Sequence, residues 1–300
     1  MSQWITEKRK PDYEYLTYTV EMLNYVYPFL KLDTVGYSWA GRKIYSLSLG
    51  NPESCSIYTA STHASEWITT LVLLRFAENL CKTKREGGEI ASIDINKILR
   101  EKGAVFIPCL NPDGVEINLN GYGSAGVFAD KIKGLTEDFS HWNANARGVD
   151  LNHNFDAGWE QLQKMEKMAG IIGPSPRQFG GKIPESELET YALTKLCREN
   201  DFNTAFALHA QGEEIFYTYG DYTPPQSELM GKILASSSGY SLVTQTGLAS
   251  HGGFKDWFIR EFGRPAFTME LGKGKNPLPI DDLESIYEKV HEMLLLGLLF

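Results

Sequence analysis

The chain has 300 residues, of which hydrophobic residues make up 42% and charged residues 22%, values close to those of ordinary globular proteins. This composition allows a sizeable core, argues against wholesale disorder, and fits a single domain over residues 1–300. The formal net charge of -9 argues against a nucleic-acid-binding surface, which needs clustered Lys and Arg.

Apolar runs of strand length alternate with longer amphipathic segments, as in α/β proteins whose helices cover a parallel or mixed sheet. Strands are predicted at 44–49, 56–60, 104–110, 204–209, 214–219 and 266–271. Helices are predicted at 13–25, 67–83, 185–200, 226–237, 255–262 and 283–299. The stretch 111–181 is rich in Gly, Asn and Asp, so we expect long surface loops there, and such loops are usually functional.

The N-terminus and the cysteines indicate the compartment. The segment MSQWITEKRKPDYEYL has charges and a proline where a secretory signal needs an unbroken apolar core, and no later stretch resembles a membrane span. We therefore expect a cytoplasmic protein with no membrane partner. Four scattered cysteines without a C-x-x-C pair predict core packing rather than disulfides or metal binding; they are Cys55, Cys81, Cys109 and Cys197.

The segment THASEW, residues 62–67, lies between the apolar run SIYTA and the helical run ITTLVLLRFAENL. His63 and Glu66 stand three residues apart, so in a tight turn both side chains can reach one point, and the pair suits a zinc site. By itself this pattern is common in proteins. A surface histidine beside a glutamate that complements a helix dipole is then the simpler interpretation.

Two more polar residues stand at the ends of predicted strands. His209 ends the run FNTAFALH, and Glu270 follows AFTM, where a carboxylate is costly to bury unless it is used. Alone, His209 fits an edge histidine and Glu270 fits an ion pair with a nearby Lys or Arg. Together with His63 and Glu66 they supply three zinc ligands, an open position and a carboxylate that accepts a proton from water. Ligands of open α/β sheets bind beyond the carboxyl ends of strands, which favours this site.

Six motifs resemble, in order, those of the zinc metallocarboxypeptidase family typified by carboxypeptidase A, over nearly the whole chain. They are HASE (63–66), NPDG (111–114), RGVDLNHNF (147–155), LHAQ (208–211), GGFKDW (252–257) and FTMEL (267–271). The resemblance implies a three-layer α/β/α globule with a mixed, twisted eight-stranded sheet. It also implies one Zn²⁺ ion bound by His63, Glu66 and His209, with Glu270 as general base and acid.

The same resemblance implies roles in the RGVDLNHNF segment. Arg147 matches the arginine that polarises the scissile carbonyl, and Asn152 matches the asparagine that helps to hold a terminal carboxylate. Asp150 and Asp156 are interpreted as loop-ordering residues. His153 stands where digestive members have a carboxylate-clamping arginine, and histidine is shorter and often neutral at pH 7. The sequence therefore disfavours recognition of an ordinary C-terminus.

Three segments of the chain resemble one branch of the family. DLNHNF, SHGGFKDWF and ELGKGKNPLP resemble the bacterial γ-D-glutamyl-meso-diaminopimelate peptidases, which act on cell-wall peptides. No tyrosine precedes GGFKDW where the family has a mobile one, and His251 and Tyr222 are the candidates to replace it. Such a substrate carries several carboxylates. Candidates to meet them, against the equally good alternative of solvated surface cations, are Lys255, Lys273, Lys275 and Arg264.

Three functions follow from these observations. The first is a zinc peptidase that hydrolyses the γ-D-glutamyl-meso-diaminopimelate bond of murein peptides, with a small cell-wall peptide as its partner. The second is a metallocarboxypeptidase that trims ordinary peptides. The third is a non-catalytic peptide-binding module, against which the presence of all three ligands and Glu270 counts.

Overall fold

The computed structural model describes residues 9–244 and 247–300. Its main sheet has eight strands in the order β1-β2-β6-β3-β7-β10-β8-β9. Pairing is parallel from β6 to β10 and between β8 and β9, and it is antiparallel for β1–β2, β2–β6 and β10–β8. The mixed eight-stranded sheet is thereby confirmed. The strands are Lys31–Tyr37 (β1), Lys43–Gly50 (β2), Cys55–Ala60 (β3), Gly103–Ile107 (β6), Phe202–His209 (β7), Glu214–Phe216 (β8), Ser241–Val243 (β9) and Ala266–Glu270 (β10), with Glu89–Ile90 (β4) and Ile93–Asp94 (β5) as a separate ladder.

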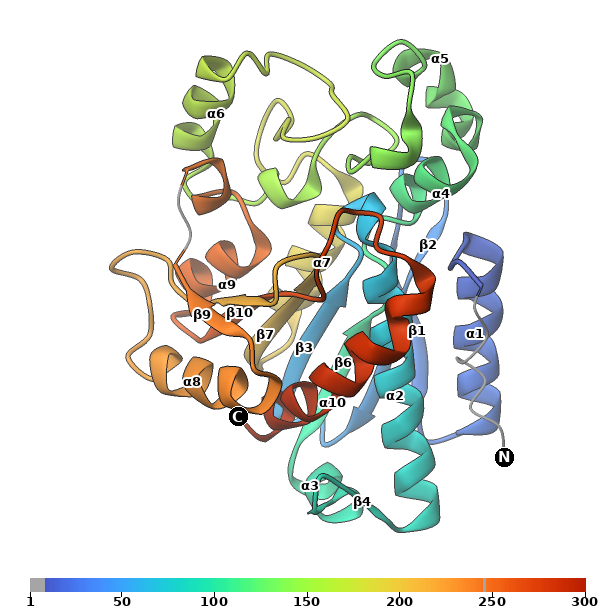
Figure 1. Cartoon of the computed structure of the whole chain (residues 1–300), viewed down its shortest axis with the longest axis vertical. Helices are drawn as coiled ribbons and strands as arrows, with labels where there is room; N and C mark the ends of the chain where they lie inside the picture. The colour runs from blue at the N-terminus through green and yellow to red at the C-terminus, as the bar shows by residue number, and fades with distance from the viewer. Residues whose placement is uncertain (1–8, 245–246) are drawn as a thin grey trace.

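Helices cover both faces of this sheet, which confirms the three-layer architecture. Figure 1 shows α2 and α10 in front of the sheet and α7 behind it. Tyr58 and Phe206 pack with the front helices, whereas their strand neighbours Ile57 and Ala205 pack with α7 and α9. The helices are Tyr13–Val26 (α1), Ile68–Glu86 (α2), Ile95–Glu101 (α3), Pro112–Asn120 (α4), Ala129–Ile132 (α5), Trp159–Met168 (α6), Leu188–Glu199 (α7), Ser227–Ser238 (α8), Phe254–Phe262 (α9) and Leu283–Leu299 (α10).

The prediction of long surface loops over 111–181 is wrong in part. Helix α4 begins inside it, with Pro112 in its first turn and the Asn111 side chain accepting a hydrogen bond from Gly114 N. Helix α6 lies there as well, and Trp142 is fully buried in a small cluster of its own. Asn, Pro and Gly occur both in turns and at helix starts, so the composition of this stretch could not distinguish these helices from loops.

The edges of the sheet were also missed. Strand β1 alternates between exposed and half-buried residues, and β9 has three residues, so neither shows the apolar run that marks the central strands. The four cysteines are buried and free, as predicted. Within the described residues, none of the helices is long and apolar enough to cross a membrane.

Candidate metal centre and substrate site

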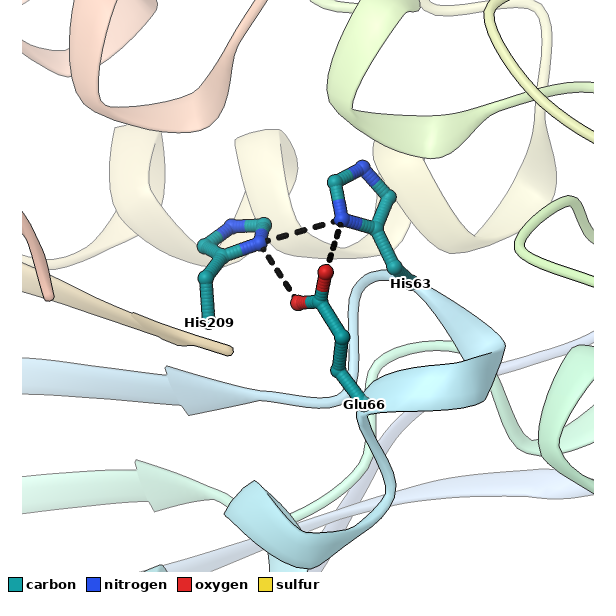
Figure 2. Close-up of side chains that lie close together, drawn as sticks. All are labelled: His63, Glu66 and His209. Atoms are coloured by element: carbon teal, nitrogen blue, oxygen red, sulfur yellow. Dashed lines mark hydrogen bonds and ion pairs between the residues drawn. The ribbon is translucent and has the colours of Figure 1, made fainter. Parts of the chain in front are cut away.

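Three side chains from the ends of two paired strands meet at one point (Figure 2). His63 and Glu66 lie in the turn after β3, and His209 ends β7, which pairs with β3. One oxygen of Glu66 lies 2.9 Å from His63 Nδ1, and the other lies 2.9 Å from His209 Nδ1. The two Nδ1 atoms are 3.2 Å apart. Two rings and a carboxylate thus point their donor atoms at one small volume.

This donor set fits zinc. One ligand atom from each of the three residues lies within 4.8 Å of the others, and the ligands of a tetrahedral Zn²⁺ ion stand about 3.3 Å apart. Burial by itself would raise the pKa of Glu66, but His63 and His209 outweigh burial and lower it to about 2. The carboxylate is therefore ionised, as a metal ligand must be.

Asp150 supports the site from behind His63. Its Oδ1 lies 3.1 Å from His63 Nε2, and its Oδ2 accepts a hydrogen bond of 2.8 Å from Gln178 N. Metal-binding histidines usually donate their second ring N–H to such a carboxylate, which fixes the ring orientation. Asp150 does order its loop, as the sequence suggested. Its contact with His63 was missed, because no local pattern links the two residues.

Glu270 lies beside the three ligands. It ends β10 and is the register partner of His209 on β7, so the two side chains share one face of the sheet. Burial raises the pKa of Glu270 well above its ordinary value, and the nearby Glu66 carboxylate raises it further. In the described part of the chain its side chain has no hydrogen-bond partner. Glu270 is thus a carboxylate positioned for proton exchange next to a candidate metal site.

The profile of the Zinc carboxypeptidase family matches residues 17–293. The chain belongs to this family. Gamma-D-glutamyl-L-diamino acid endopeptidase 1 of Lysinibacillus sphaericus is 33% identical over 290 residues, which cover 96% of this chain and 72% of the relative. Uncharacterized protein YqgT of Bacillus subtilis is 34% identical over 302 residues, covering 99% and 79%. The structure of bovine thrombin-activatable fibrinolysis inhibitor is similar with a TM-score of 0.75 at 19% identity, covering 97% and 96%.

Membership of the zinc carboxypeptidase family confirms that the protein is a zinc metallopeptidase. Its Arg147, however, contacts none of the three ligand residues. Arg147 Nη1 lies 3.6 Å from Glu187 Oε1, and the guanidinium lies 4.4 Å from the ring centre of Trp39. Glu187 is buried and also accepts a hydrogen bond of 3.0 Å from Trp39 Nε1. A role of Arg147 at the substrate carbonyl stays a prediction, and it requires the guanidinium to leave these partners.

Two asparagines that the sequence analysis did not single out hold the turn that carries His63 and Glu66. Asn143 accepts hydrogen bonds from Ala64 N at its backbone oxygen (3.1 Å) and from Ser65 Oγ at its Oδ1 (2.5 Å). Asn276 Nδ2 donates to Glu66 Oε1 at 3.4 Å. Both lie in loops without a ligand-type motif, so only the fold reveals them.

Asn152 and His153 are neighbours in sequence but differ in their surroundings. Asn152 is half-buried, and its Oδ1 accepts a hydrogen bond of 3.2 Å from Phe254 N. His153 is only 7% exposed, and its Nδ1 lies 2.9 Å from Oε1 of the fully buried Glu166 on α6. A contact of His153 with substrate stays a prediction, and in the structure its ring lies buried against α6.

His251 lines a pocket of about 310 Å³ together with Tyr219 and Tyr222, and Thr218, to which Lys255 donates, lines it as well. Lys255 is 2% exposed and donates to Thr218 O, 2.6 Å away, and to the buried Asp256. It is therefore not a solvated surface lysine. Burial raises the pKa of Asp256, and Lys255 opposes this effect.

The other cations that the sequence proposed for substrate carboxylates are placed differently. Arg264 Nη1 donates to Phe202 O, at the start of β7, the opposite end of the strand from His209. Lys273 Nζ lies 3.0 Å from Glu213. Arg264 is thereby removed from the candidate substrate residues, since a strand separates it from the metal site.

Proposed function

We propose that this zinc metallopeptidase hydrolyses the γ-D-glutamyl-meso-diaminopimelate bond of murein peptides, with one Zn²⁺ ion held by His63, Glu66 and His209. The convergence of the two Nδ1 atoms and the Glu66 carboxylate beside Glu270 carries the proposal. The substrate class is supported by the name of the relative that is 33% identical, a γ-D-glutamyl-L-diamino acid endopeptidase.

The residues divide the reaction between them. A zinc ion in this site would act as a Lewis acid toward water and toward the scissile carbonyl. Glu270 accepts the proton of the attacking water and then delivers it to the leaving amine, which accounts for both proton transfers. Asp150 keeps the His63 ring in the orientation that presents Nδ1 to the site. Arg147 is proposed to stabilise the oxyanion once it has left Glu187.

Substrate contacts are proposed for Asn152, His251 and Lys255. Asn152 lies beside Gly253. A Cβ atom at position 253 would stand 3.3 Å from Asn152 Oδ1, so the glycine leaves room next to the side-chain amide of Asn152. His251 lies in the wall of the adjacent pocket. Lys255 is neutralised by Asp256, so a substrate carboxylate has to compete with that aspartate.

The alternative enzyme is a carboxypeptidase of ordinary peptides, and the family also contains relatives such as Carboxypeptidase B of Rattus norvegicus, 24% identical. The absence of an arginine at position 153 disfavours it. The third possibility, a non-catalytic binding module, would not need a carboxylate with a raised pKa beside a complete ligand set.

The test compares L-Ala-γ-D-Glu-meso-diaminopimelate, its lysine counterpart and a hippuryl amino acid. We expect the diaminopimelate peptide to be cut fastest, and the lysine peptide to be cut at least about 100-fold more slowly, because unpaired polar groups in the pocket reject it. Equal kcat/KM values for the two tripeptides would exclude the murein substrate. Preference for the hippuryl substrate would favour the ordinary carboxypeptidase, and metal-free protein in elemental analysis would favour the binding module.

A further inference from the structure

Three side chains form a row across neighbouring strands at the metal edge of the sheet, by which we mean the strand ends that carry His63, His209 and Glu270. His209 on β7 is the register partner of Glu270 on β10, and Glu270 is the register partner of Glu214 on β8. Directly paired residues point to the same face, so a metal ligand, the general base and Glu214 share one face. Adjacent strands are about 4.8 Å apart, which puts Glu214 about 10 Å from the strand of the ligand. Since an extended chain rises about 3.3 Å per residue, that distance is about three residue lengths from the strand of the ligand.

Glu214 differs from the acid that precedes it. Glu213 faces α10, where Lys289 Nζ lies 2.5 Å from one carboxylate oxygen and Lys273 Nζ lies 3.0 Å from the other. Glu214 is half-buried and has neither an ion pair nor a side-chain hydrogen bond with any described residue. Its Oε2 lies close to Gly212, where a Cβ atom would stand 3.3 Å from it and 3.4 Å from Glu270 Cβ. Glu213 is thus neutralised by two lysines, whereas Glu214 faces the site without a cationic partner among the described residues.

An unneutralised carboxylate next to another carboxylate is unfavourable unless a cation arrives. The two charges of a zinc ion would be balanced by Glu66 and Glu270, so Asp150 and Glu214 would both add negative charge at the site. Asp150 has His63 and Gln178 N as partners, whereas Glu214 has none among the described residues. We propose that Glu214 is a specificity residue that binds a primary ammonium group of the peptide substrate. This rests on the proposed function for the position of the scissile bond, and it adds the charge that the substrate must carry.

A murein peptide offers this ammonium from two sources: the N-terminus on the acyl side of the bond, and the distal amine on the leaving side. The experiment compares the parent L-Ala-γ-D-Glu-meso-diaminopimelate with two analogues. The first is acetylated at the N-terminus, and the second carries 2-aminopimelate in place of diaminopimelate and so lacks only the distal amine. Because a charge-assisted hydrogen bond is lost, we expect the wild-type enzyme to cut one analogue about 10- to 100-fold more slowly than the parent.

The variant Glu214→Gln keeps the shape of the side chain and removes its charge. We expect it to bring the parent-to-analogue ratio of kcat/KM to within about threefold of 1, with little change on the analogue itself. Glu213→Gln is the matched control and should retain the wild-type ratio. Zinc content and the thermal unfolding midpoint of both variants establish that they are folded.

Several outcomes overturn the inference. One is a ratio that Glu214→Gln leaves unchanged, and another is an equal loss on parent and analogue, which would place the effect on Glu270 instead. A wild-type enzyme that ignores both amines contradicts it as well. If the enzyme cuts no murein peptide, the proposed substrate is wrong, and Glu214 is tested by the same ratio on an ordinary tripeptide with a free or acetylated N-terminus.

Discussion

The metal edge of the sheet and the 111–181 segment present functional residues in different ways. At the metal edge, His63, His209 and Glu270 follow the ends of strands whose order and register fix their spacing. In the segment, Asn152 and His153 lie in a short turn held by side-chain contacts to other loops. Backbone pairing thus places the proposed reacting groups, whereas individual side-chain hydrogen bonds place the residues proposed to surround the substrate. Substitutions in the two regions should therefore have different effects on zinc binding, turnover and stability.

Removal of a ligand at the metal edge should have the largest effect. His63→Ala or His209→Ala is expected to lose both stoichiometric zinc and activity, because the two remaining ligands cannot hold the ion against buffer. Elemental analysis and peptide hydrolysis are measured on the same sample. His291→Ala, on the distant helix α10, is the control and should keep both. Full zinc in either ligand variant would show that the metal is held elsewhere.

Glu270→Gln should separate chemistry from metal binding. We expect folded protein with zinc still bound and turnover reduced by about 10³-fold, because only the group that transfers the proton is changed. Zinc content and kcat on the murein peptide are the measurements. Near-normal turnover would assign the general base to another residue.

The same difference explains how much the sequence could predict. The central strands have unbroken apolar runs and the metal motifs stand at their ends, so the α/β/α fold and the metal set were found. The pairs His63–Asp150, His153–Glu166 and Arg147–Glu187 join residues from separate segments whose contact depends on the folded chain. The division of the chain into one domain over 1–300 stays a prediction.

Glu189, in the first turn of α7, should make the stability of the protein depend on pH. It is fully buried, and burial, followed by Asp113 and Glu187, raises its pKa from 4.5 to about 8. Between these values the unfolded chain releases a proton that the folded chain keeps. The stability is therefore fully present below pH 4.5 and is lost as the pH rises through about 8, by about 5 kcal/mol in total.

Glu189→Gln should remove this part of the pH dependence, because the amide is neutral in both states. Urea unfolding of the wild type and the variant at pH 5 and pH 8 gives the free energy of unfolding of each protein. Between these two pH values, the free energy of unfolding of the wild type should fall relative to that of the variant. Glu199→Gln, exposed on the same helix, should follow the wild type. Parallel curves for wild type and Glu189→Gln would mean that Glu189 is ionised in the folded protein.

The smallest expected effect concerns His153 and tests the segment directly. His153→Ala removes the ring nitrogen that lies 2.9 Å from Oε1 of the fully buried Glu166. Among the described residues, Glu166 then keeps Gln163 Nε2 and Gly180 N as hydrogen-bond donors, both to its Oε2. Breaking such a buried pair should lower the free energy of unfolding by about 3 kcal/mol. The preference for diaminopimelate over lysine should stay unchanged, because the ring lies against α6.

The double variant His153→Ala/Glu166→Gln supplies the control for that result. It replaces the buried carboxylate whose Oε1 loses its histidine partner in the single variant, so it should regain part of the lost stability in a double-mutant cycle. Urea unfolding of the four proteins gives the coupling free energy, and kcat/KM on the two tripeptides gives the preference. A residue that only supports α6 would change stability and leave the ratio of the two kcat/KM values unchanged. A His153→Ala enzyme that is as stable as the wild type and cuts the lysine and diaminopimelate peptides equally well would therefore indicate that His153 contacts the substrate.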